Sequence, residues 1–253
     1  MKYALITGAT SGIGKEFAIT LARKGYNLIL TGRREKELNE LKNILEKEQK
    51  INIILVIGEF SDHRTLNSIL ENAKGKNIKF LINNVGYGNK MSFFEGTLDE
   101  SLKMINVHIN SVIRLCYEIA PLMKDSYIIN TSSMAAYLPT SYNHIYASTK
   151  SFLITFSEAL NFSLKNNNVK VKVLCPGFTY TDFHRNEKDI KSKKNKFKWM
   201  KSEKVVEYTI KNIDNKKIIL VPGIINKIAY YFLKLMPKFI VYNFNSVTKT
   251  NKS

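Results

Sequence analysis

The sequence contains few cysteines and few acidic residues, and both shortages restrict what the protein can be. Cys116 and Cys175 are the two cysteines among 253 residues, and each lies inside an apolar run. A disulfide framework is therefore not expected, and a reducing compartment, by default the cytoplasm, is the predicted location. Asp and Glu number 21 against 39 Lys and Arg, which gives a formal net charge of +18.

This charge alone assigns no function. It favours anionic partners such as nucleic acid, acidic membranes or phosphorylated substrates. A lysine-rich solvated surface explains the same composition. We expect no specific nucleic-acid role, and a weak contact at the periphery of a membrane stays open.

Long apolar stretches are also missing. No window of about 18 uncharged apolar residues occurs, so a transmembrane helix is not predicted. The run from Met1 to Gly8 is too short for a signal peptide and continues into a glycine-rich turn. The apolar fraction of 44% is enough to build a core, and no internal repeat or low-complexity linker interrupts the chain. One compact domain is the simplest interpretation.

Short β-branched runs alternate with longer amphipathic stretches along the whole chain. This alternation is typical of a parallel sheet wrapped by helices, so we predict an α/β fold with a doubly wound sheet of about seven strands and helices on both faces. Residues 34–49 predict a helix with one apolar stripe, formed by Leu38, Leu41, Ile44 and Leu45. The predicted strands are Tyr3–Thr7, Asn27–Thr31, Asn52–Ile57, Lys79–Asn83, Tyr127–Thr131, Lys170–Leu174 and Lys217–Val221.

Two segments depart from this alternation. Residues 188–204 contain eight lysines and interrupt a βα unit, so we interpret residues 182–201 as a lid, with the next helix beginning near Ser202. From Ile224, apolar residues recur at helical spacing up to Pro237. The sequence therefore predicts a binding and catalytic domain over 1–223. It also predicts an amphipathic extension over 224–253 that caps the core, dimerises or lies on a membrane.

A glycine-rich turn connects the first predicted strand to the following helix. Glycines permit a tight turn and close approach of the backbone to a pyrophosphate, and the helix N-terminus offers free N–H groups. A structural turn without a ligand is the alternative, which the strand-to-helix context disfavours. The residues predicted to contact a dinucleotide here are Gly8, Thr10, Ser11, Gly12, Ile13 and Gly14.

The ends of the second and fourth predicted strands add to this dinucleotide site. Arg33 stands where an NAD-binding protein would place an acid, and its guanidinium would pair with a 2′-phosphate, so NADP(H) is favoured over NAD. Ordinary surface charge is the alternative for Arg33 and Arg34. Asn84 and Gly86 follow the fourth strand and are predicted to line an adenosine pocket, although the same residues are common in plain turns.

Ser133, Tyr146 and Lys150 form the candidate catalytic group. Tyr146 and Lys150 are four residues apart on a predicted helix, so they share one face. An ammonium near a phenol stabilises the phenolate and lowers the pKa of the phenol, which is otherwise about 10. Ser133 follows the fifth predicted strand at its carboxyl end, where its hydroxyl can orient a substrate oxygen. No metal site is predicted.

In these motifs the chain resembles the short-chain dehydrogenase/reductase family over nearly its whole length. The resemblance implies one Rossmann-like domain in which Tyr146 exchanges the proton, Ser133 orients the carbonyl and Lys150 also binds the nicotinamide ribose. It implies further that Pro176, Gly177 and Thr181 flank the nicotinamide, and that the protein is a homodimer or homotetramer. The residues that carry the resemblance are 7–14, 83–86, 131–133, 146–150, 175–177 and Thr181.

More narrowly, the chain resembles a branch grouped with ketoacyl and hydroxysteroid reductases, which implies an NADP(H)-dependent oxidoreductase acting on an apolar or acyl-type ketone. Two positions depart from the family. His108 stands where an Asn usually takes part in the proton relay, and Asn106 or Asn110 takes that role if the register differs. Glu59 replaces an Asp that receives the adenine amino group. The missing Asn motivates the alternative of an NADP(H)-binding sensor or scaffold without turnover.

Overall fold

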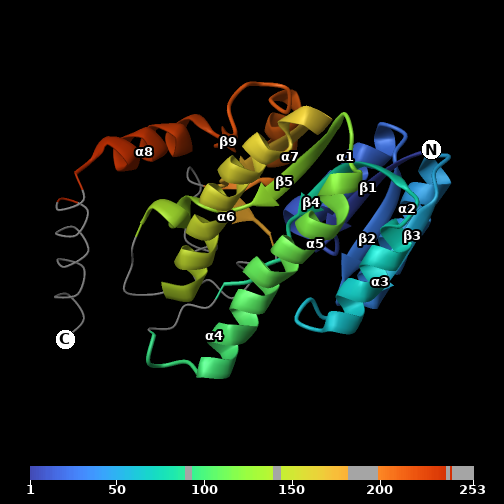
Figure 1. Ribbon diagram of the computed structural model, residues 1–253, viewed down its shortest axis with the longest axis horizontal. Helices are drawn as coiled ribbons and strands as arrows, with labels where there is room; N and C mark the ends of the chain where they lie inside the picture. Colours follow the sequence, from blue (N-terminus) through green and yellow to red (C-terminus); the bar gives the residue numbers. More distant parts are fainter. Residues whose placement is uncertain (89–92, 139–143, 182–198, 238–239, 241–253) are drawn as a thin grey trace.

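A seven-stranded parallel sheet forms the centre of the protein, as predicted (Figure 1). The computed structural model describes residues 1–88, 93–138, 144–181, 199–237 and 240. The strand order is β3-β2-β1-β4-β5-β6-β9, so the order reverses between β1 and β4. The strands are β1 (Lys2–Thr7), β2 (Asn27–Gly32), β3 (Ile53–Ile57), β4 (Asn77–Asn83), β5 (Ser126–Thr131), β6 (Val169–Leu174) and β9 (Ile219–Leu220).

Helices cover both faces of this sheet (Figure 1). On β1, Ala4 and Ile6 belong to one core cluster whereas Tyr3 and Leu5 belong to the other. Because side chains alternate between the faces of a strand, a strand covered on both sides is apolar throughout. One face is covered by α1 (Gly12–Arg23), α2 (Glu35–Glu48) and α7 (Ser202–Lys211), and the other by α3 (His63–Ala73), α5 (Ser111–Ile119) and α6 (His144–Ser163).

The apolar stripe of α2 is buried at three of its four residues. Leu38, Leu41 and Leu45 are buried, whereas Ile44 is exposed. At about 100° per residue, Ile44 lies about 60° beyond Leu41, at the edge of the stripe. The predicted stripe is present, and Ile44 forms its exposed edge.

Irregular helical segments connect several of these elements. A π-helix, η1 (Asn106–Asn110), joins α4 (Leu98–Ile105) to α5, and η2 (Ala120–Leu122) ends that long helix. The 3₁₀ turn η3 (Met134–Tyr137) follows β5, and η4 (Lys165–Asn167) follows α6. The π-helix places its widened turn at His108.

The two segments that depart from the βα pattern are described in part. Residues 182–198 of the predicted lid lie outside the described residues, but β7 (Thr179–Tyr180) and β8 (Met200–Lys201) pair as a separate two-stranded sheet. The helix expected from Ile224 is α8 (Ile224–Leu235), and α7 begins at Ser202 as predicted. Within the described parts of the chain, no helix has both the length and the apolar character to span a bilayer.

Candidate active site

The glycine-rich turn lies between β1 and α1, at the carboxyl edge of the sheet. Gly12 has a φ of +55°, which side chains other than glycine rarely adopt. A Cβ at Gly14 would overlap the carbonyl oxygen of Gly8. Ser11 precedes α1 without a side-chain hydrogen bond to the helix, so the N–H groups of the first turn are available to an anion. The turn therefore fits the pyrophosphate of a dinucleotide.

The two arginines after β2 have different partners. Arg33 forms an ion pair with Glu59, with Nη1 and Oε1 3.1 Å apart and both side chains largely exposed. Arg34 Nη2 donates a hydrogen bond to Thr10 Oγ1 at 2.9 Å. The sequence predicts that Arg33 binds a cofactor phosphate. In the structure Arg34 is the arginine that contacts the glycine-rich turn.

Asn84 braces the glycine-rich turn from the end of β4. Its Nδ2 lies 3.3 Å from the carbonyl oxygens of both Thr7 and Gly8. Its backbone N–H donates to Thr7 Oγ1 at 2.9 Å. A Cβ at Gly86 would lie 3.3 Å from Lys150 Nζ, so the segment after β4 reaches the candidate catalytic group.

Ser133, Tyr146 and Lys150 meet beside this segment, where helical spacing predicts Tyr146 and Lys150 and the end of β5 predicts Ser133. The Ser133 and Tyr146 side chains are hydrogen-bonded. Lys150 Nζ lies 5.7 Å from the centre of the Tyr146 ring and donates to the Thr131 carbonyl at 2.9 Å. Thr131 is the last residue of β5 and Ser133 lies two residues beyond it. The end of β5 therefore holds this group against the first turns of α6.

Burial dominates the electrostatics of this group. Desolvation lowers the pKa of Lys150 to about 8. Desolvation also raises the pKa of Tyr146 to about 12, although its hydrogen bond to Ser133 acts in the opposite direction. The sequence predicts that the ammonium lowers the pKa of this phenol, but in the structure the desolvation of the ring is the largest influence on that pKa.

His108 is completely buried and both of its ring nitrogens are engaged. Nε2 accepts the backbone N–H of Tyr87 at 3.0 Å, which requires Nε2 to be unprotonated. The hydrogen is therefore on Nδ1 and is donated to Thr149 Oγ1 at 3.0 Å, and Thr149 in turn donates to the Tyr146 carbonyl at 2.8 Å. Burial, followed by the charge of Lys150, lowers the pKa of His108 to about 2. His108 thus ties the segment after β4 to α6 as a neutral group.

Asn106 and Asn110 do not enter the site. Both are exposed, and the Nδ2 of Asn110 donates to the Oδ1 of Asn106 at 2.7 Å. The sequence alone leaves these two residues open as substitutes for the family asparagine. The structure instead places His108 inside the site, where Tyr87 and Thr149 are partners that the sequence did not reveal.

The segment after β6 closes the other side of the site. The Pro176 carbonyl accepts the N–H of Met134 at 3.0 Å, next to Ser133. The Thr181 side chain fills the space where a Cβ at Gly12 would lie, with Cγ2 2.6 Å from that position. The predicted nicotinamide residues and the glycine-rich turn are therefore adjacent.

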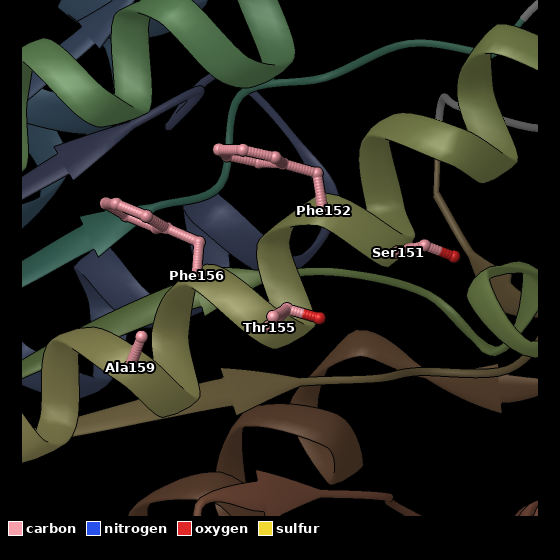
Figure 2. Close-up of a pocket in the computed structure, with 5 residues that line it drawn as sticks. All are labelled: Ser151, Phe152, Thr155, Phe156 and Ala159. Carbon is pink, nitrogen blue, oxygen red and sulfur yellow. The ribbon is translucent and has the colours of Figure 1, made fainter.

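A hollow on α6 lies apart from these residues (Figure 2). Figure 2 shows Phe152 and Phe156 on one side of α6 and Ser151 on another, and the two rings are stacked with centroids 5.6 Å apart. The hollow is lined by Ser151, Phe152, Thr155, Phe156 and Ala159, none of them a predicted site residue.

The homodimer or homotetramer stays a prediction. Among the described residues, no group of three or more His, Cys, Asp or Glu side chains is placed to bind a metal.

The glycine-rich turn and the candidate catalytic group fall within a known protein family. A model of the short chain dehydrogenase family matches residues 2–192, which include the glycine-rich turn and Ser133, Tyr146 and Lys150. The chain belongs to this family. The resemblance inferred from the motifs is therefore confirmed.

Relatives of this short chain dehydrogenase confirm its resemblance to the ketoacyl and hydroxysteroid branch. It is 33% identical over 196 residues to a very-long-chain 3-oxoacyl-CoA reductase of Mycosarcoma maydis, covering 72% of this chain and 55% of that protein. It is 32% identical over 180 residues to 17-beta-hydroxysteroid dehydrogenase type 3 of Rattus norvegicus, covering 69% and 59%. The chain spans little more than half the length of these curated relatives.

Solved structures support the fold of this short chain dehydrogenase. A short-chain dehydrogenase from Sphingobium yanoikuyae in complex with NADPH aligns with a TM-score of 0.83 at 24% identity, covering 92% of each chain. A 7beta-hydroxysteroid dehydrogenase aligns with a TM-score of 0.87 at 21% identity, covering 97% of this chain and 96% of that one. At these identities the similarity establishes the Rossmann-like fold.

Proposed function

We propose that this short chain dehydrogenase is an NADP(H)-dependent oxidoreductase that transfers a hydride between the nicotinamide and a carbonyl or alcohol. The observation that carries the proposal is the convergence of Ser133, Tyr146 and Lys150 at the edge of the sheet that also presents the glycine-rich turn. Ligands of open α/β sheets bind at this edge, where the strand order reverses.

The cofactor preference rests on the two arginines. Arg33 and Arg34, and no acid, stand directly after β2 and supply positive charge at that position. A guanidinium pairs with a phosphate through parallel hydrogen bonds, and the exposed ion pair of Arg33 with Glu59 is weak enough to be exchanged for one. These charges support NADP(H) over NAD.

The proposed substrate is an apolar or acyl-type ketone. The relatives named as 3-oxoacyl-CoA and hydroxysteroid enzymes favour this class. In the structure, Phe93 and Phe94 are exposed, and the Phe93 ring lies 5.9 Å from the ring of His144, two residues before Tyr146. These rings offer an exposed apolar surface at the start of α6, the helix that carries Tyr146.

The residues of the chain then divide the remaining work. When bound, the nicotinamide supplies or accepts the hydride. Ser133 donates a hydrogen bond to the substrate oxygen, and Tyr146 gives that oxygen a proton in reduction and removes it in oxidation. The charge of Lys150, 5.7 Å from the centre of the Tyr146 ring, would act against the desolvation that raises the pKa of Tyr146. His108 maintains the position of Tyr146 through Thr149 and takes no proton itself.

Tyr146→Phe tests this assignment. Removal of the hydroxyl should lower the rate of NADPH oxidation with apolar and acyl ketones by about 10²–10⁴-fold, because general acid catalysis contributes about that factor. Binding of NADPH, followed by quenching of the single tryptophan, Trp199, should be unchanged.

Tyr137→Phe is the matched control, since Tyr137 contacts the Tyr230 ring at 5.1 Å and has no proposed role in proton transfer. Unchanged turnover in Tyr146→Phe would refute the mechanism. NADPH binding by the wild type without product from any ketone of the panel would favour the sensor or scaffold instead.

A further inference from the structure

Helix α8 presents its apolar side chains to solvent. Its exposed large side chains are between 48% and 80% accessible. At about 100° per residue they fall within a sector of about 120°, which we call the outer face of α8. The outer face consists of Ile224, Ile225, Ile228, Tyr231, Phe232 and Leu235.

The opposite side of α8 attaches the helix to the body of the protein. Tyr230 is buried and its ring contacts Tyr137 of η3 edge-on at 5.1 Å. The Asn226 side chain lies against Gly177, filling the space where a Cβ there would be, and its Nδ2 donates to the Pro222 carbonyl at 2.8 Å. A helix of a globular protein normally buries its apolar stripe, so α8 has the reverse orientation.

The part of the sequence that contains α8 carries charge of one sign. Residues 215–253 of the sequence contain seven lysines and no aspartate or glutamate. Lys227 and Lys234 lie together at one border of the outer face, and each Nζ lies over a ring, Tyr208 at 4.7 Å and Tyr230 at 5.8 Å. Apolar side chains bordered by lysines characterise helices that lie in the interface of a membrane.

We propose that the outer face of α8 binds the surface of an anionic phospholipid bilayer. The helix lies at the margin of the molecule, on the side away from α2 and α3, so a flat surface can reach it (Figure 1). The apolar side chains enter the boundary between headgroups and acyl chains, and the lysines contact the lipid phosphates and carboxylates. Charge complementarity favours anionic lipid over a neutral apolar partner. This inference goes beyond the proposed function and does not depend on turnover.

Vesicle flotation of the full chain tests the proposal. The wild type should float with phosphatidylcholine vesicles that contain phosphatidylserine, and about tenfold less with phosphatidylcholine alone. Ile228→Glu combined with Phe232→Glu should lower flotation about tenfold, because charge on the outer face opposes insertion. Both side chains are exposed, so the fold should be preserved, as circular dichroism would verify.

Leu98→Glu combined with Leu122→Glu is the matched control. Leu98 and Leu122 are 71% and 78% exposed, at least as exposed as Ile228 and Phe232. The control pair changes the net charge by the same amount as the α8 pair. Flotation of this control should equal that of the wild type. Lys227→Gln combined with Lys234→Gln should weaken flotation with the anionic vesicles by about tenfold, and added salt should do the same.

Several results would overturn the proposal. One is a wild type that floats with neither vesicle, or with both equally. Another is an equal loss for the two glutamate pairs. A third is a fall in molar mass by light scattering for the α8 pair without any change in flotation, which would show that a second copy of the chain covers the outer face.

Discussion

The buried imidazole of His108 makes the stability of the protein depend on pH in a way that one substitution should reveal. The groups that face His108 are Lys150, whose positive charge opposes protonation, the Tyr87 and Tyr146 rings, and the Thr149 hydroxyl. The folded-state pKa is about 2, whereas an unfolded histidine has a pKa of about 6.5. Below pH 6.5 only the unfolded chain binds this proton, so stability that is present above that pH is lost as the pH falls.

The size of this loss follows from the two pKa values. Each pH unit below about 6.5 lowers the free energy of unfolding by about 1.4 kcal/mol, so at pH 5 the loss from His108 is about 2 kcal/mol. His108→Asn removes it. At pH 7.5 the variant should be less stable by about 1–3 kcal/mol, because the Tyr87 N–H and Thr149 hydroxyl lose well-placed partners. That difference should shrink by about 2 kcal/mol at pH 5.

Urea unfolding followed by circular dichroism at pH 7.5 and pH 5 measures both differences. His63→Asn is the matched control, since His63 is exposed at the start of α3 and the same exchange there reports what the substitution does outside the buried site. The other histidines contribute equally to wild type and variant and cancel in the comparison. A His108→Asn difference that does not change with pH would mean that the imidazole gains a proton in the folded protein, and the hydrogen-bond assignment would be wrong.

Two further predictions concern the cofactor. Replacing Arg33 or Arg34 with Ala should weaken NADPH binding by about 10–100-fold, because a charge-assisted hydrogen bond to the extra phosphate is lost. The affinity for NADH should stay within about twofold. A wild type that binds both dinucleotides equally would contradict the preference. Lys150 has a lowered pKa of about 8 and carries its charge below that pH, so wild-type affinity for NADPH should fall as the pH rises through 8. Lys150→Met should bind NADPH more weakly at pH 7 and show no such step, and a step retained in the variant would assign the titration to another group.

Much of the fold follows from the sequence because the sheet is covered on both faces. A strand such as β1 supplies side chains to two core clusters at once, so its sequence is apolar without interruption and easily recognised. β7 and β8 are two residues each and leave no periodic pattern. Ile44 shows the limit of helical periodicity, which gives the direction of a side chain but not where the neighbouring surface ends.

The candidate site follows from the sequence in the same uneven way. Tyr146 and Lys150 are neighbours by helical spacing, and Ser133 is placed by the end of β5, so local pattern finds all three. The partners of His108 are 21 and 41 residues away along the chain, and no local spacing indicates them. The raised pKa of Tyr146 arises from burial, which only the assembled structure determines.

The small sheet of β7 and β8 has an evolutionary consequence. Thr179 is paired with Met200 and Tyr180 with Lys201, so the chain leaves and returns to the body at one fixed place. A change in length between residues 181 and 199 keeps both ends of the stretch at this pairing, so β7 and β8 can stay in place. A lineage can diversify this stretch while the nucleotide-facing half of the protein stays unchanged.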